Sequence, residues 1–187
     1  GVLLHVRKAL AALEHDASSG LADSEALSLR WRLFQTREAA LDLQGRRAEQ
    51  RADLDAMTHV AEALNDDRKG AHAAWRRSYL ALRTADWATQ ETNARRGMAL
   101  AKRCGDDELR LRCQRLLALA LAQQHDPHGA RTLAEDALVQ AQALGSRDVQ
   151  AACLNALGLI ASNHQGDPVA ALAFNERTLT LYRDLGN

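Results

Sequence analysis

The chain has 187 residues, of which 47% are hydrophobic, 26% are charged and only 4% are aromatic. Ala and Leu predominate and there are two prolines, a composition that favours helices and is poor in the β-branched and aromatic residues of strands. The 24 basic and 24 acidic residues give no net charge, so the bulk attraction to nucleic acid or to an anionic membrane is missing. We therefore expect an all-α protein whose partners are neither nucleic acid nor membrane.

The first predicted element is a lone amphipathic helix within residues 1–14, where apolar residues recur at helical spacing from Leu3 to Leu13. The polar residues 15–24 follow it as the predicted linker. The helix could be the second half of an earlier hairpin, and the sequence starts without Met. We therefore expect this chain to be an excerpt from a longer protein.

The sequence also predicts a cytoplasmic location. Its first residues lack the basic region and cleavage site of a signal peptide, and no uncharged apolar stretch approaches the ~18 to 20 residues of a membrane span. The sequence has an odd number of cysteines, three, and all lie in apolar helical positions. This is typical of buried thiols that stay reduced, and the residues are Cys104, Cys113 and Cys153.

Residues 25–187 repeat themselves at a fixed interval. Gly105, Gly145 and Gly186 each end an apolar helical segment and lie 40 and then 41 residues apart. A period of this length predicts an array of helical repeats, in which each unit packs only on its neighbours. The array is predicted to hold four helical hairpins, at residues 25–65, 66–105, 106–145 and 146–187.

The last hairpin has the clearest helix boundaries. Ser146 is a predicted N-cap, and apolar residues recur after it at spacings of three and four. Gly166 then ends the first helix, and Pro168 opens the second one. The acidic pairs that begin at Asp66 and Asp106 start the first helix of their hairpins, so capping explains them without catalysis.

No motif for catalysis or for a cofactor is found in the sequence. There is no glycine-rich phosphate loop, no dinucleotide fingerprint and no glycine-framed nucleophile. His125, Asp126 and His128 are the most metal-like cluster, but two histidines that flank a turn without a third ligand at a defined spacing are typical of a solvated loop. We expect a chain that is not an enzyme and that holds neither metal nor cofactor.

One sequence pattern resembles the tetratricopeptide repeat. The pattern consists of the run Asn155-Ala156-Leu157-Gly158, then Gly166-Asp167-Pro168, Ala171 and Leu179. The resemblance implies a right-handed α-α superhelix of helical hairpins. The sequence departs from the family pattern at Arg76, which stands at the position of the repeat's Leu, and at Gln50 and Gln90, which stand at that of its small alanine. The period also exceeds the usual ~34 residues.

The longer unit, with endings such as Leu181–Gly186 and Ala141–Gly145, resembles the repeat regions that follow nucleotide-binding modules in large bacterial signalling proteins. These include AAA or STAND ATPases, adenylate or guanylate cyclases and LuxR-type regulators. The resemblance implies a non-catalytic scaffold that binds another protein, a peptide or another domain of the same polypeptide.

Arginines recur on the first helix of successive hairpins. In tetratricopeptide arrays these helices line the concave groove, so the resemblance implies a trough in which guanidinium groups could pair with carboxylates. Aromatic residues on the same helices are the available anchors, although they could equally be core residues. The alternative is a solvated face whose arginines pair with nearby acids. The predicted groove residues are Arg30, Arg32, Arg76, Arg77, Arg112, Arg115, Trp75 and Tyr79.

Two other functions stay open at this point. The final helix, with Leu172, Leu179, Leu181, Tyr182 and Leu185, has no following repeat to cover it in this excerpt, so we expect that it could form a homodimer. A small-ligand sensor would instead require a deep, mostly apolar pocket with a few converging polar groups.

Overall fold

The computed structural model describes residues 1–15, 23–124, 126–184 and 186, and these residues form helices and short turns without any strand. The helices in these ranges are α1 (Val2–His15), α2 (Asp23–Leu43), α3 (Arg47–Ala63), α4 (Asp67–Arg83), α5 (Trp87–Arg103), α6 (Asp107–Gln123), α7 (Pro127–Ala143), α8 (Arg147–His164) and α9 (Pro168–Asp184). Most of the predicted linker, His125 and Leu185 lie outside the described residues.

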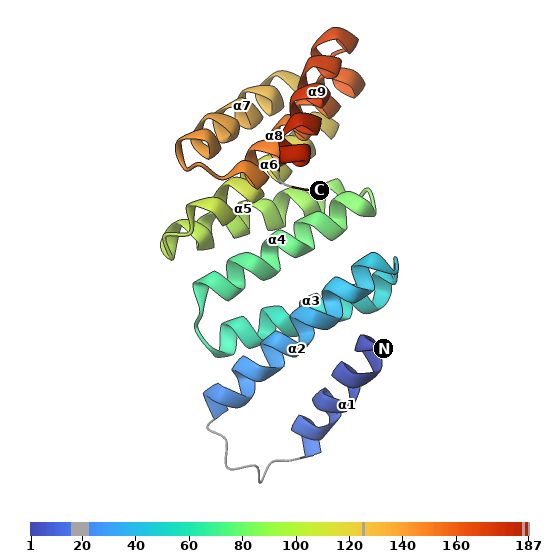
Figure 1. The fold of residues 1–187 in the computed structure, drawn as a ribbon. Coiled ribbons are helices and arrows are strands. Elements are labelled where there is room, and N and C mark those ends of the chain that lie inside the picture. The colour runs from blue at the N-terminus through green and yellow to red at the C-terminus, as the bar shows by residue number, and fades with distance from the viewer. Residues whose placement is uncertain (16–22, 125, 185, 187) are drawn as a thin grey trace.

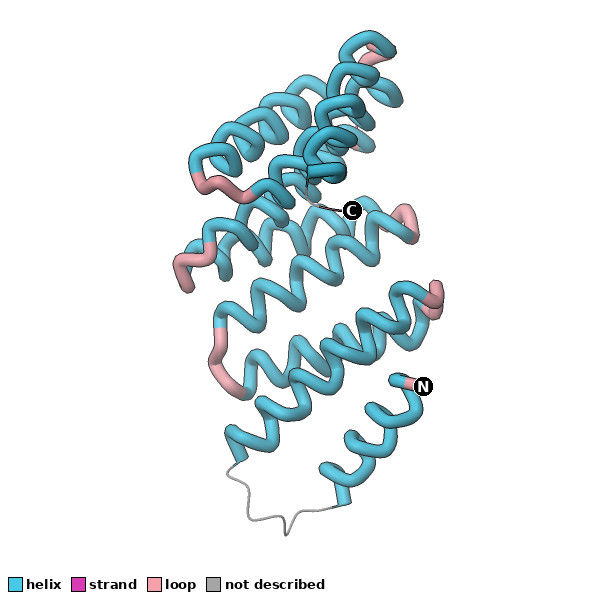
Figure 2. The backbone as a smooth tube through the Cα atoms, viewed as in Figure 1, coloured by secondary structure: helices cyan, strands magenta, loops and turns pink. Residues whose placement is uncertain are grey.

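The helices form a stack that rises from α1 to α9 (Figure 1), and Figure 2 shows the short turns that join successive antiparallel helices from α2 onward. Each helix contacts the next one along the chain, and α4, α6 and α8 also contact one another in sequence. We call α2, α4, α6 and α8 the A helices, because each opens a helical pair, and α3, α5, α7 and α9 the B helices. This arrangement confirms the predicted all-α solenoid of helical repeats.

The turns form because their residues tolerate a left-handed backbone. Gly105 has φ 69° and Gly145 has φ 69°, so each can close the helix before it. The N–H of Asp106 then donates to the carbonyl of Ala101 at 2.9 Å, which satisfies the end of α5. Asn65, with φ 48°, takes the place of glycine after α3, as its sequence position predicts.

Aspartates begin most of the helices that follow these turns. The carboxylate of Asp66 accepts from the N–H of Lys69 at 2.9 Å, and that of Asp106 accepts from the N–H of Leu109 at 3.0 Å. These hydrogen bonds confirm the capping role predicted for both acidic pairs. The prediction for Ser146 is wrong in one respect, because Ser146 stands at the N-cap of α8 but its side chain makes no capping hydrogen bond.

The C-terminal half of the stack has a continuous apolar interior. Leu111, Val149, Cys153 and Ile160 are fully buried there among alanines and leucines of α6, α7 and α8. Burial raises the pKa of the Cys153 thiol to about 11, so little of it is thiolate at neutral pH. Cys113 is also buried, and its Sγ would lie 2.5 Å from a Cβ added at Gly97, which explains why this position of α5 has no side chain.

Candidate partner-binding face on the A helices

Arg76 is held by acids of the preceding A helix. Its Nη2 donates to Glu38 at 2.7 Å and to Asp42 at 2.9 Å, and both acids belong to α2. The side chain of Arg76 is 14% exposed and that of Glu38 is 2% exposed. Burial alone would lower the pKa of Arg76, but the hydrogen bonds and charges of Glu38 and Asp42 outweigh burial and raise it. Arg76 is therefore neutralised within the chain.

A polar network surrounds this ion pair, and the sequence pattern did not indicate it. The amide of Gln50 on α3 donates to Glu38 at 2.7 Å, and Arg47 donates to the amide oxygen of Gln50 at 2.7 Å. Arg47 also pairs with Asp42. The one feature of the sequence that could have indicated this network is Gln50, a long polar residue at the position where the tetratricopeptide pattern has a small alanine. The network ties α2, α3 and α4 together.

The predicted groove arginines therefore divide into separate groups. Arg77 pairs with Asp55 of α3, so it faces a B helix. Arg32 is exposed in a shallow depression of α2 that also holds Glu25, and Arg30 is half-buried on the same helix. The structure does not bring Arg30, Arg32 and Arg77 together with the other predicted residues.

Five predicted residues do lie together: Arg76 and the four residues Trp75, Tyr79, Arg112 and Arg115, which we call the α4–α6 cluster. All four are half-buried. The guanidinium of Arg112 lies 5.6 Å from the ring centroid of Trp75, and that of Arg76 lies 5.5 Å from the rings of both Trp75 and Tyr79. Cation–π contacts of this kind fix the rings and the guanidinium groups relative to one another.

The two arginines of the cluster differ in their partners. Arg112 donates to Glu108, one turn earlier on α6, at 2.6 Å, and lies 3.9 Å from Asp148 of α8. Arg115 makes no ion pair or hydrogen bond with any described residue, and its Nε is shielded from solvent. Burial disfavours the charged form and lowers the pKa of Arg115.

His72 adjoins the cluster and was missed by the sequence analysis. Its ring meets those of Trp31 at 6.0 Å and Trp75 at 5.3 Å between centroids, both edge to face. Burial, together with the charges of Arg76 and Arg112, lowers the pKa of His72 to about 4. The neutral imidazole thus fills the space between α2 and α4. His72 occupies the same position in its hairpin as Arg112 does in the hairpin two helices later. This correspondence was the one signal in the sequence that could have identified His72 as a site residue.

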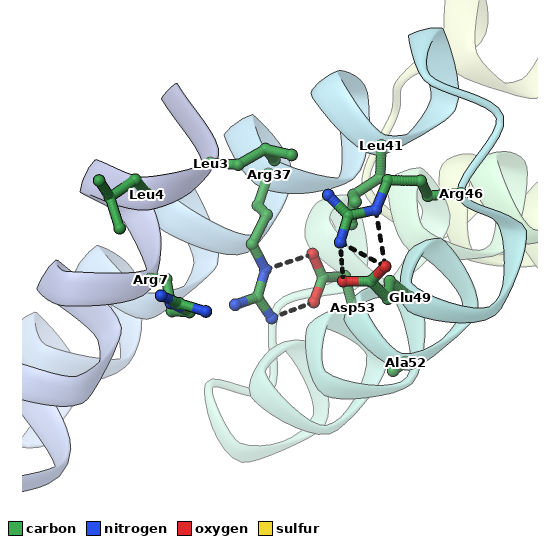
Figure 3. A pocket seen from close by; sticks show the side chains of 9 residues that line it. All are labelled: Leu3, Leu4, Arg7, Arg37, Leu41, Arg46, Glu49, Ala52 and Asp53. Atoms are coloured by element: carbon green, nitrogen blue, oxygen red, sulfur yellow. Dashed lines mark hydrogen bonds and ion pairs between the residues drawn. The ribbon is translucent and has the colours of Figure 1, made fainter. Parts of the chain in front are cut away.

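A pocket of about 310 Å³ lies elsewhere, between α1, α2 and α3. Figure 3 shows that Arg37 and Asp53 form an ion pair at its wall, and that Arg46 and Glu49 form another, with Leu41 beside them. Most of the polar groups at this wall therefore already have partners. The volume is at the lower limit of small-molecule sites, and the pocket lies away from the α4–α6 cluster.

The last helix presents apolar side chains to solvent. Val169 is 78% exposed, Leu172 60% and Leu179 49%. Leu181 is instead half-buried against the core of α6, α7 and α8. Within the described residues no group of three or more His, Cys, Asp or Glu side chains could hold a metal ion, and none of the described helices is long and apolar enough to cross a membrane.

The fold defines a helical-repeat protein whose A helices carry a half-buried cluster of aromatic and arginine side chains. No protein-family model matches the sequence, and no curated protein matches it either. Among solved structures, the crystal structure of BtubC (BKLC) from P. vanneervenii is similar, with a TM-score of 0.71 and 15% sequence identity. The match covers 98% of this chain and 75% of that chain. At this identity the similarity shows the fold alone, a helical-repeat solenoid.

Proposed function

We propose that this chain is a non-catalytic scaffold that binds a protein segment across its A helices. The segment belongs either to another protein or to another domain of the same polypeptide. The observation that carries the proposal is the α4–α6 cluster, in which half-buried aromatic rings and guanidinium groups are presented by stacked helices. Tyr, Trp and Arg are the residue types that contribute most to binding at protein interfaces.

Contacts within the chain support the proposal that this face stays ordered without its partner. Arg76 holds the rings of Trp75 and Tyr79 from one side while Glu38 and Asp42 hold Arg76. A side chain that is already fixed loses less conformational entropy on binding, which favours affinity. Because the net charge is zero, we further propose that the partner is neither nucleic acid nor an anionic membrane surface.

The helical-repeat fold and the sequence pattern support a finer assignment. We propose that the hairpins are long-period tetratricopeptide repeats from a cytoplasmic bacterial signalling protein, and that the scaffold couples partner binding to an attached output domain. A partner would do this by favouring one arrangement of the stacked helices over another.

Site-specific photo-crosslinking in cells that carry the protein tests the scaffold. A photoreactive residue replaces Glu108 or Asp148, which are exposed on A helices beside the cluster, or Val139, which is exposed on the B helix α7. We expect a discrete crosslinked protein, or an internal crosslink to another part of the polypeptide, from positions 108 and 148 only. Equal products from position 139, or none from the A helices, would contradict the proposal.

Self-association is the second candidate function, because α9 exposes Leu172 and Leu179. The test is light scattering of Leu172→Lys against Val139→Lys, two exposed apolar positions on different B helices. A concentration-dependent dimer that is lost only in Leu172→Lys would favour self-association. Leu181 is unsuited to this test because it packs against the core.

A further inference from the structure

Two pockets lie at equivalent places in the helical stack. One, of about 220 Å³, lies between α3, α4 and α5, and the other, of about 310 Å³, lies between α7, α8 and α9. Arg96 in the first pocket and Arg177 in the second each follow the first residue of their B helix by the same number of residues. Leu100 and Leu181 correspond in the same way. We call the second pocket the α7–α9 groove, and its walls include Leu138, Gln142, Leu154, Arg177 and Leu181.

The first pocket carries its own counter-ion. Nη2 of Arg96 donates to the carboxylate of Glu62 on α3 at 2.8 Å, so the preceding B helix neutralises the arginine. At the equivalent place between α5, α6 and α7, the polar groups also have partners within the chain. Asp136 stands at the position of the arginines and accepts from the amide of Gln114 on α6 at 2.7 Å. A carboxylate therefore takes part in the polar contact at both places.

The α7–α9 groove lacks both of these partners. Gln142 stands at the position of Glu62, and Leu154 stands at that of Gln114. Arg177 is exposed and makes no ion pair or hydrogen bond with another residue in the part of the chain that the structure describes. The groove therefore combines a guanidinium that has no counter-ion with an apolar wall.

The apolar wall is formed by leucines, and the groove is limited at one end. Leu138 is 7% exposed and Leu154 is 2% exposed, so α7 and α8 contribute buried side chains to it. One helical turn beyond the residues that line the groove on α8 and α9, Arg147 of α8 pairs with Asp184 of α9. This ion pair joins the two helices there, so the open space suits a compact ligand better than an extended segment.

The lining and the charge of the groove indicate what it would bind. Mostly apolar walls with one orienting polar group are typical of sites for small organic molecules, and the volume is within their range. Arg177 supplies one positive charge, so the complement is a monoanion. Glu62 shows that a carboxylate is the group that pairs with an arginine at this position of the repeat.

We propose that the α7–α9 groove binds a small organic molecule that carries one carboxylate on an alkyl or aryl group. The carboxylate accepts hydrogen bonds from the guanidinium of Arg177, and the apolar group packs against Leu138, Leu154 and Leu181. The site lies between two B helices and shares no residue with the α4–α6 cluster. This inference is therefore independent of the proposed scaffold function, and either one can fail alone.

NMR titration of the intact chain with 4-phenylbutanoate tests the site. The probe carries a single carboxylate on an apolar group, and 4-phenylbutanamide is its uncharged counterpart. The methyl resonances of Leu154 and Leu181, identified by their absence in the corresponding Met variants, report whether the groove is occupied. Those of Leu172 and Leu179, which are exposed on another side of α9, report non-specific adsorption.

We expect the methyl resonances of the groove to shift with a dissociation constant of about 1 mM, as for a ligand of this size. The amide should bind about threefold to fivefold more weakly, as for the loss of one exposed ion pair. Arg177→Gln should weaken binding of the carboxylate by the same factor and leave binding of the amide unchanged.

Two further variants sharpen the test. Gln142→Glu supplies to Arg177 the counter-ion that Glu62 supplies to Arg96, and it should weaken binding of the carboxylate at least as much as Arg177→Gln does. Arg183→Gln is the matched control with no expected effect, because it removes a charge from α9 outside the groove. All three variants replace exposed side chains, so each should fold as the wild type does.

Equal binding of the carboxylate and the amide, or of the carboxylate to Arg177→Gln and to the wild type, would overturn the carboxylate site. Shifts of Leu172 and Leu179 at the same probe concentration would also overturn it, because the probe would then adsorb to any exposed leucine. If Leu154 and Leu181 do not shift up to about 10 mM probe, the groove is not a site for this class of molecule.

Discussion

The first and the last junctions between A helices are built differently. No Cα atom of α2 lies within 8 Å of one of α4 among the described residues, whereas α6 and α8 approach that closely. Trp31, His72 and the ion pair of Arg76 with Glu38 bridge the wide junction. Leucine, alanine and cysteine side chains fill the narrow one. Junctions between repeats of the same period can therefore be stabilised either by directional polar contacts or by close apolar packing.

Breaking the ion pair at the wide junction should have the largest effect. Glu38→Ala removes the buried acceptor of Gln50 and leaves Arg76 with Asp42 as its one carboxylate partner, and we expect it to lower the free energy of unfolding by about 3–5 kcal/mol. Urea denaturation measures the loss, and hydrogen exchange should show that it is concentrated in α2, α3 and α4.

Two controls sharpen this prediction. Glu49→Ala removes the exposed pair with Arg46 and should cost no more than about 1 kcal/mol. The double variant Glu38→Leu/Arg76→Met removes both charges and should recover most of the stability lost in Glu38→Ala. A double variant as unstable as the single one would show that packing, and not the lost ion pair of Arg76 with Glu38, accounts for the loss.

The narrow junction should respond to the loss of side-chain volume. Leu157 is 1% exposed, and Leu157→Ala should lower the free energy of unfolding by about 2–5 kcal/mol through lost burial and the remaining cavity. Leu159, two residues along α8, is 42% exposed, so Leu159→Ala is the matched control with a much smaller effect. Loss of exchange protection in α2 on Leu157→Ala would contradict the view that the two junctions are held independently.

Acidification should also destabilise the wide junction, with a smaller effect than Glu38→Ala. The pKa of His72 is about 4 in the folded chain and 6.5 in the unfolded chain. As the pH is lowered, the unfolded chain therefore binds a proton at this residue before the folded chain does. Stability is therefore full above pH 6.5 and falls as the pH is lowered towards 4, by up to about 3 kcal/mol from this residue.

Urea denaturation at pH 7 and pH 4.5 measures this loss, and NMR titration of the His72 ring measures its pKa directly. His72→Gln should reduce the difference between the two pH values. A ring that titrates near pH 6.5 in the folded chain would contradict the burial of His72 between the two tryptophans.

The fold could be predicted from the sequence because its signals are local. The interval between Gly105 and Gly145, the caps at Asp66 and Asp106, and the three-and-four spacing of apolar residues each depend on a few neighbouring positions. These signals gave the all-α solenoid correctly. They did not give the capping geometry at Ser146, where the side-chain hydrogen bond is absent.

The candidate site could be predicted only in part. Arginine on successive A helices indicated a charged face, but the partners of each guanidinium lie far along the chain: Glu38 is 38 residues from Arg76, and Asp55 is 22 residues from Arg77. Which arginines are neutralised follows from packing between hairpins, and the helical period does not encode it. That Arg115 differs from the other arginines in having no acidic partner among the described residues becomes visible only once its neighbours on α4, α8 and α9 are known.

The bulk of the rings between α2 and α4 also has a geometric consequence. In a stack where each hairpin contacts only its neighbours, the orientation of a hairpin is determined by its packing against the adjacent one. Trp31 and His72 lie in the joint between α2 and α4, so we expect their size to influence the angle at which α2 packs against the rest of the molecule. Substitutions with smaller side chains at these two positions should therefore change the relative orientation of the helices on either side of the joint without changing any helix.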